Sequence, residues 1–187
     1  MPNLSNLRVA VLATDGFEES ELTEPVRVLK EAGARVEILS TKSGQIQAFR
    51  HHDKGTAVSV DRVLDEAQPN EYDAVLLPGG ALNADTLRME PKVQFFLQQM
   101  QQAGKPFAVI CHAAWELVSA NLVQGRTLTS YFTIQDDIRN AGGNWVDREV
   151  VVDGNWVTSR QPDDLPAFNR EMLNLFAQFT PTASGSR

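Results

Sequence analysis

The sequence predicts an α/β fold, in which a three-layer α/β/α sandwich surrounds a mostly parallel, flavodoxin-like sheet with a nucleophile elbow and a late β-hairpin. Three observations predict it. Short, almost wholly apolar segments alternate with segments whose apolar residues recur at helical spacing, as in βαβ units. Uninterrupted apolar runs are typical of parallel strands covered on both faces. An Asp-Gly-Asn turn between two β-branched runs signals the hairpin.

The elements follow in order along the chain. Residues 7–13 form an apolar strand, and the helical pattern of residues 17–32 ends at Gly33. Residues 44–60 interrupt the alternation and predict a small annex of loop and short strand. Further strands are predicted at residues 34–40, 72–77, 107–110, 145–152 and 156–159, and further helices at residues 63–66, 91–103 and 165–179.

Length and composition bound the protein's class. A chain of 187 residues with 42% hydrophobic content is long enough for one core. We therefore expect one domain over residues 1–187, with its core at about 7–179 and a polar, disordered tail at 180–187. The first residues lack a secretory signal and the chain has a single cysteine, so we expect a cytoplasmic protein without a disulfide framework.

Charge and hydropathy exclude two kinds of partner. The net charge is −7 and no cluster of lysine and arginine occurs, which argues against an extended nucleic-acid partner. No apolar run approaches the roughly 20 residues that a membrane span requires. We therefore expect neither nucleic acid nor membrane as a partner.

Cys111 is the most informative residue. It follows the predicted strand at 107–110 and precedes a helical segment, so it lies at a turn that can hold a nucleophile out of the sheet. Backbone N–H groups at a helix N-terminus favour an anion, and a lowered thiol pKa would make Cys111 reactive. The alternative is a small, buried and inert core residue.

Two other strand ends are expected near Cys111, because ligands of parallel sheets bind outside the carboxyl ends of the strands. Gly79 and Gly80 follow a strand and allow close backbone approach, which suits an oxyanion hole. Glu18 and Glu19 follow the strand predicted at residues 7–13. If that strand lies beside the strand bearing Cys111, one of the two carboxyls can hydrogen-bond the thiolate.

The histidines divide into two groups. His112 is adjacent to Cys111 in sequence, so its ring is expected to leave the turn in another direction; it can still act as a general acid or base if an acid, for which Asp85 is a candidate, orients it. His51 and His52 lie in a polar loop with too few ligands for a metal, and we expect them on the surface. No metal or cofactor is predicted.

Five separated motifs resemble the PfpI family of the class I glutamine amidotransferase-like superfamily, which also includes the parkinsonism-associated deglycase. They are Asp-Gly-Phe-Glu-Glu (15–19), Ala-Val-Leu-Leu-Pro-Gly-Gly (74–80), Ala-Val-Ile-Cys-His (108–112), and the segments at 148–160 and 162–170. The resemblance covers residues 7 to about 179. It implies that Cys111 is the nucleophile, that Glu18 hydrogen-bonds its thiolate, and that His112 is the third catalytic residue.

The resemblance also implies the surroundings of the nucleophile. An acid of a neighbouring subunit, matched here by Asp85, would orient His112, so the site would be completed at the interface of a homodimer or larger homo-oligomer. The backbone N–H groups of Gly80 and His112 would form the oxyanion hole, and Tyr131 would line the pocket. The family usually has Gly-Pro after Cys-His, whereas this chain has Ala113, Ala114 and Trp115, which add bulk beside the nucleophile.

By this resemblance we expect a cysteine-dependent stress-response hydrolase or lyase. Its substrate would be a small carbonyl compound or a modified protein, as in a deglycase or glyoxalase acting on glyoxal, methylglyoxal and their early adducts. One alternative is an intracellular cysteine peptidase of the PfpI type. Another is a redox-sensing stress chaperone that uses oxidation of Cys111.

Overall fold

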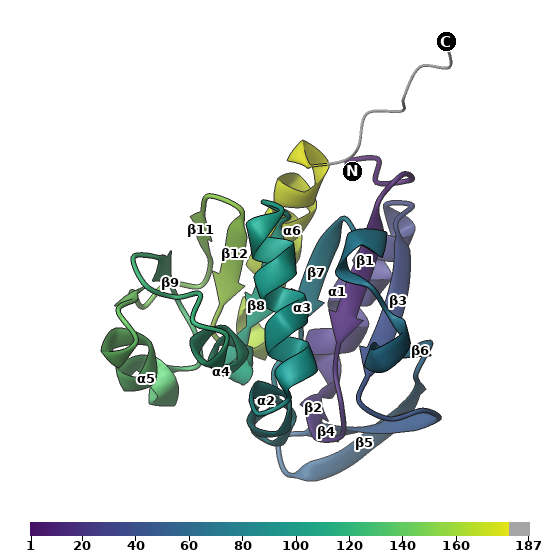
Figure 1. The fold of residues 1–187 in the computed structure, drawn as a ribbon, viewed down its shortest axis with the longest axis horizontal. Coiled ribbons are helices and arrows are strands. Elements are labelled where there is room, and N and C mark those ends of the chain that lie inside the picture. The colour runs from purple at the N-terminus through teal and green to yellow at the C-terminus, as the bar shows by residue number, and fades with distance from the viewer. Residues whose placement is uncertain (180–187) are drawn as a thin grey trace.

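A seven-stranded sheet forms the centre of the molecule in a computed structural model that describes residues 1–179 (Figure 1). The expected tail at 180–187 lies outside the described residues. In spatial order the strands are β11 (Val151–Asp153), β12 (Trp156–Ser159), β8 (Phe107–Ile110), β7 (Ala74–Leu77), β1 (Arg8–Leu12), β3 (Arg35–Ser40) and β6 (Arg62–Val63).

The sheet is parallel except at one edge. β7 is the middle strand, and beside it lies β1, whose Val9 is in register with Val36 of β3 and Ala74 of β7. β11 pairs antiparallel with β12, which confirms the predicted late hairpin. Every residue of β7, β8 and β12 is buried, as expected for strands covered on both faces.

Helices cover both faces and confirm the predicted three-layer α/β architecture (Figure 1). On one face, α1 (Glu19–Glu31) and α6 (Leu165–Gln178) pack against each other and close the first core cluster. The second core cluster lies on the other face beneath the remaining helices, which are α2 (Ala81–Arg88), α3 (Pro91–Gln102), α4 (Ala114–Ser119) and α5 (Gln135–Asn140).

A separate three-stranded sheet takes the place of the predicted annex. β4 (Gln45–Arg50) and β5 (Asp53–Ser59) form an antiparallel hairpin, and β2 (Phe17–Glu18) pairs parallel with β4. In Figure 1 this sheet lies below the carboxyl end of the central sheet, close to α2. The hairpin is therefore placed at the edge where parallel sheets bind ligands.

Short segments differ from the sequence-based expectations. The helix expected at 63–66 is a single 3₁₀ turn, and the strand expected at 145–152 divides into β10 (Asn144–Trp145), which pairs with β9 (Thr127–Leu128), and β11. α2 and α5 were not predicted, because their short patterns carry little apolar periodicity. The 3₁₀ turns are η1 (Leu64–Glu66), η2 (Pro69–Glu71), η3 (Cys111–Ala113), η4 (Phe132–Ile134) and η5 (Pro162–Asp164).

Among the described residues, no helix combines the length and apolar character needed to cross a membrane.

Trp156, on β12, is a large side chain of the second core cluster. Its ring is fully buried, lies 5.7 Å from the ring of Phe107, and carries the Arg126 guanidinium 3.9 Å above its centre. Its indole N–H donates to Gln101 Oε1 at 2.8 Å. Both apolar burial and a satisfied polar atom therefore hold this side chain in place.

We predict that Trp156→Ala lowers the free energy of unfolding by about 3–5 kcal/mol, because it leaves a large cavity and removes one of the two hydrogen bonds that Gln101 Oε1 accepts. Urea denaturation measures the change. Val152→Ala on β11 is the control, since Val152 is 49% exposed. This control should change the free energy of unfolding by less than about 0.5 kcal/mol. Equal effects of the two substitutions would contradict this assignment of the core.

Candidate active site

Cys111 occupies a strained turn between β8 and α4. It is the first residue of η3 and has a φ of 62°, a left-handed conformation that is unfavourable for a residue with a Cβ. The backbone N–H of Tyr131 donates to the Cys111 carbonyl at 3.2 Å and helps to hold the turn. The sequence-based prediction of a sharp strand-to-helix turn at Cys111 agrees with this geometry.

Gly79 lies between Cys111 and the helix α1. A Cβ atom at Gly79 would come within 2.6 Å of Cys111 Cβ and would collide with Glu21 Oε2, so no side chain larger than hydrogen fits there without displacing them. Gly80 has a φ of 94°, and a Cβ at this residue would collide with the carbonyl oxygen of Gly16. Both glycines are required by close packing at the end of β7.

Asn83 fixes this glycine turn and was not singled out from the sequence. Its side chain is fully buried, and its Oδ1 accepts a hydrogen bond from the Thr14 backbone N–H at 2.8 Å. Its amide nitrogen donates to the carbonyls of Pro78 and Gly79, each at 3.1 Å. One amide therefore links the loop after β1 to the loop after β7.

The carboxyl beside Cys111 belongs to Glu21, and the expectation for Glu18 is wrong. That expectation assumed that β1 and β8 are neighbours, but β7 lies between them. A carboxyl from α1 must therefore cross the end of β7, and Glu21 does so over Gly79. Its position was detectable, because Glu21, Pro25 and Val28 have the i, i+4, i+7 spacing of a buried helix face.

Burial controls the protonation of Glu21. It raises the pKa of this carboxyl to about 8, the negative charge of Glu18 acts in the same direction, and the Cys111 thiol and the Gly79 N–H act in the opposite direction. Neither carboxyl oxygen makes a hydrogen bond of good geometry to another described residue. Glu21 is therefore mostly protonated at neutral pH and can donate a proton to a sulfur anion.

Glu18 and Glu19 bind the hairpin instead, although Glu18 also lines the pocket described below. Glu18 Oε2 accepts a hydrogen bond from the backbone N–H of His51 at 3.1 Å. Glu19 accepts one from the Thr56 N–H at 2.6 Å and one from Arg50 Nη2 at 2.9 Å, and these contacts lower its pKa. The two carboxylates hold the β4–β5 hairpin against the N-terminus of α1.

The Cys111 thiol is 6% exposed, and burial, together with the negative charge of Glu21 when it is ionised, raises its pKa. This is opposite to the lowered pKa that its position in the sequence suggested. The backbone N–H groups of Gly80 and His112 point toward the sulfur and partly offset the effect. Because the thiol and Glu21 are in contact, ionisation of one disfavours ionisation of the other, and they titrate as a coupled pair.

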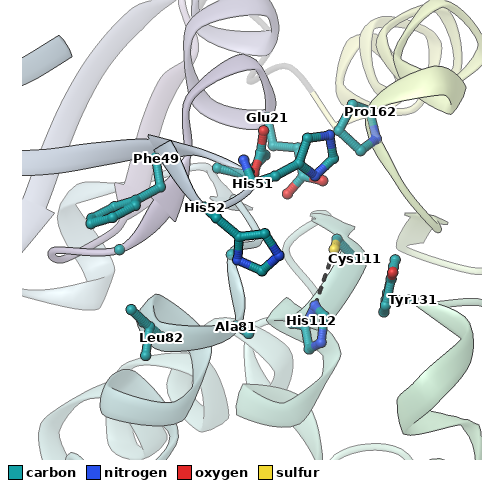
Figure 2. Close-up of a pocket in the computed structure, with 13 residues that line it drawn as sticks. Glu21, Phe49, His51, His52, Ala81, Leu82, Cys111, His112, Tyr131 and Pro162 are labelled. Atoms are coloured by element: carbon teal, nitrogen blue, oxygen red, sulfur yellow. Dashed lines mark hydrogen bonds between the residues drawn. The ribbon is translucent and has the colours of Figure 1, made fainter. Parts of the chain in front are cut away.

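His112 contacts the sulfur, contrary to the expectation that its ring leaves in another direction. Its Nδ1 lies 3.3 Å from Cys111 Sγ (Figure 2). The ring stacks on Tyr131, with 4.6 Å between centroids, and lies in a T-shaped arrangement with Trp115, with 5.3 Å between centroids. Burial lowers the pKa of His112, so at neutral pH it is a neutral imidazole that can accept a proton.

Trp115 lies elsewhere than expected, and the Asp85 carboxylate has no partner among the described residues of one chain. Trp115 supports the ring of His112 and donates its indole N–H to Asp137, but it does not line the pocket. Asp85 is on the exposed side of α2, and its carboxylate makes no hydrogen bond or ion pair within residues 1–179. Within one chain, it does not orient His112.

A pocket of about 570 Å³ opens above Cys111, and Gly80, His112 and Tyr131 are among its lining residues. His51 and His52 are exposed, as expected, but they also line this pocket (Figure 2). Nothing in the sequence indicated that the hairpin turn would lie over the nucleophile. In the described part of the chain, no group of three histidine, cysteine or carboxylate side chains is arranged to hold a metal ion.

We predict that Asn83→Ala slows alkylation of Cys111 by iodoacetamide and lowers the free energy of unfolding by about 1–3 kcal/mol, because the Thr14 N–H and the Pro78 carbonyl lose this partner and the Gly79 carbonyl keeps only the Glu18 N–H. Mass spectrometry of the labelled protein and urea denaturation measure the two effects. The exposed Asn140→Ala is the control and should change neither. An alkylation rate equal to that of the wild type would show that Asn83 does not position the site.

We predict that stability falls as pH rises from 5 to 7, by on the order of 3 kcal/mol from Glu21 alone. In the unfolded chain this carboxyl ionises near its ordinary pKa of 4.5, whereas in the native state it keeps its proton up to about pH 8. Its stabilising contribution is therefore complete below pH 4.5 and is lost as pH rises toward 8.

Urea denaturation at pH 5 and pH 7 measures this slope. Glu21→Gln should flatten it, whereas Glu66→Gln, at an exposed position, should leave it unchanged. Glu116→Gln should flatten it as well, because Glu116 on α4 is fully buried, its carboxyl oxygens have no hydrogen-bond partner among the described residues, and burial raises its pKa. Parallel pH profiles for all four proteins would contradict the protonated state of both acids.

Comparison with known proteins finds relatives that match most of the chain. Deglycase PfpI of Pyrococcus furiosus is 44% identical over 169 residues, which span 90% of this chain and 99% of the relative. Putative cysteine protease YraA of Bacillus subtilis is 40% identical, over 90% of this chain and 97% of the relative. The crystal structure of Drosophila melanogaster DJ-1beta superposes with a TM-score of 0.84 at 26% identity, covering 95% of this chain and 91% of that one.

The family model described as the DJ-1/PfpI family matches residues 7–175. This range contains the whole central sheet, α1 with its glutamates, and the Cys111 turn. The chain therefore belongs to the DJ-1/PfpI family.

Proposed function

We propose that this protein is a cysteine-dependent enzyme that acts on reactive carbonyl compounds, as a deglycase or glyoxalase acting on glyoxal, methylglyoxal and their early adducts. One observation carries the proposal: the Cys111 sulfur lies between a protonated carboxyl, Glu21, and a neutral imidazole, His112, at the base of a pocket. The names of the relatives as deglycases and as a putative cysteine protease support an enzymatic role.

The first step is addition of sulfur to an aldehyde carbon. The thiol proton passes to His112 Nδ1, at 3.3 Å, and the sulfur forms a bond to the carbon while the carbonyl electron pair moves to oxygen. The N–H groups of Gly80 and His112, which point toward the sulfur in the free protein, can stabilise this oxyanion. His112 then returns the proton to oxygen, which gives a hemithioacetal.

For methylglyoxal, the remaining steps convert the hemithioacetal to lactate. A base removes the hydrogen on the sulfur-bearing carbon, and protonation of the neighbouring carbon yields a thioester of lactate. Water then cleaves the thioester and restores the thiol, so the net reaction is methylglyoxal plus water to lactate. Neutral His112 fits the role of the base, and protonated Glu21 can stabilise sulfur as it leaves.

Pocket size favours substrates beyond free methylglyoxal. A volume of about 570 Å³ falls in the range of ordinary small-molecule sites and exceeds what a three-carbon compound fills. Trp115, which was expected to add bulk beside the nucleophile, packs against His112 and is not among the residues that line the pocket. Early adducts of a dicarbonyl with an amino acid therefore fit the proposal as well as the free compound does.

We further propose that a second copy of the chain completes the site. Among the described residues of one chain, no carboxylate hydrogen-bonds the His112 ring, which contacts Cys111, Tyr131 and Trp115, and the Asp85 carboxylate is unpaired on the exposed side of α2. In a homodimer or larger assembly, a partner's Asp85 would orient the His112 ring. A role as a redox sensor is less well supported, because a thiol that is 6% exposed with a raised pKa is a poor target for peroxide.

We predict that the wild-type protein forms lactate from methylglyoxal and that Cys111→Ala forms none. Lactate is measured enzymatically in buffers with and without primary amines, because amines deplete free aldehyde without catalysis. Lactate at equal rates from both proteins would exclude Cys111 as the nucleophile. If neither protein forms lactate although iodoacetamide alkylates wild-type Cys111 rapidly, carbonyl turnover is excluded and peptide hydrolysis becomes the reaction to test.

A further inference from the structure

The turn of the β4–β5 hairpin forms one wall of the pocket above Cys111. Its two residues are His51 and His52, and both line the pocket together with Cys111 and His112. Figure 2 shows the two imidazole rings reaching from the hairpin toward the space above Cys111. The reaction proposed above uses only the groups at the base of the pocket, so these two rings have no role in it.

The hairpin is held in place by the same helix that carries Glu21. Glu19 binds the backbone of Thr56 and the side chain of Arg50, on either side of the turn, and Glu18 accepts the His51 backbone N–H. The hairpin is also tied to the loop after β1, because the Gly16 N–H donates to the Gln47 carbonyl at 2.9 Å. These contacts fix the turn relative to Cys111.

His51 adopts a conformation that such anchoring must maintain. Its φ is 58°, in the left-handed region that residues with a Cβ seldom occupy. The hydrogen bond from its backbone N–H to Glu18 Oε2 is 3.1 Å long and stabilises this conformation. The side chains of His51 and His52 thus project from a turn of defined geometry rather than from a free loop.

We propose that His51 and His52 hydrogen-bond the oxygen on the carbon next to the one that Cys111 attacks, and so make the site selective for 1,2-dicarbonyl compounds over simple aldehydes. This inference rests on the proposed addition of the thiol to a carbonyl. The oxyanion formed by the attack faces the backbone N–H groups at the base of the pocket. The second oxygen extends away from the base, toward the wall that carries the two imidazole rings.

A matched pair of probes tests the proposal without requiring turnover. Methylglyoxal and propanal each have three carbons and an aldehyde, but only methylglyoxal has the second oxygen. Each reacts reversibly with a thiol and protects it from iodoacetamide. For each aldehyde, the protection constant is the association constant obtained from the slowing of Cys111 alkylation. The measured quantity is the constant for methylglyoxal divided by that for propanal, and this ratio is then divided by the same ratio for N-acetylcysteine to remove the intrinsic difference in reactivity.

We expect this normalised ratio to exceed one in the wild type and to fall by about five-fold when one hydrogen bond is lost. His52→Phe keeps a ring but removes its N–H, and His51→Asn tolerates the left-handed conformation with a shorter side chain. Lys54→Ala, on β5 and not among the residues that line the pocket, is the control and should keep the wild-type ratio. Protection by propanal should change little in any variant.

Each outcome decides between the two proposals. A normalised ratio of one in the wild type, or a ratio unchanged in both histidine variants, would overturn the role of the histidines even if lactate forms. An equal fall in Lys54→Ala would also overturn it, since the effect would then belong to the hairpin as a whole. An elevated ratio that falls only in the histidine variants would support the inference even if no lactate forms, and the proposed turnover alone would then fail.

Discussion

The close approach of Glu21 and Cys111 over Gly79 is the constraint on which the site depends. The helix that carries the carboxyl follows β1, the thiol follows β8, and β7 lies between these strands. The carboxyl must pass over the end of β7, where a Cβ would collide with its Oε2. Glycine at this position lets a proton donor on α1 meet a nucleophile at the end of β8, and Asn83 holds the turn that contains this glycine.

Three carboxyls near the N-terminus of α1 have two different roles. Successive helical residues point in different directions, so Glu18 and Glu19 meet the hairpin while Glu21 turns into the core. The outer pair remains accessible to solvent and binds N–H groups, whereas the inner carboxyl is desolvated and keeps its proton. One helix end thereby positions both the base of the pocket and its hairpin wall.

The site carries features that oppose stability. Cys111 has a left-handed backbone, and the buried carboxyls of Glu21 and Glu116 lack well-formed hydrogen bonds among the described residues. Strain and desolvated acids of this kind persist where the surrounding fold over-determines them, and they concentrate at functional sites. Here the fully buried strands β7, β8 and β12 supply that support. Glu21 has a neighbour that explains its burial, whereas no contact in the described structure explains the burial of Glu116.

The sequence by itself determined the alternation of strands and helices, the late hairpin and the turn at Cys111, because each depends on local periodicity and on turn-forming residues. It could not determine strand order, and that order decided the site: with β7 between β1 and β8, Glu21 rather than Glu18 reaches the thiol. The same holds for His51 and His52, which only the docking of the hairpin on α1 brings over the pocket. Local patterns report which face of an element is buried, whereas contacts between distant segments arise only when the sheet assembles.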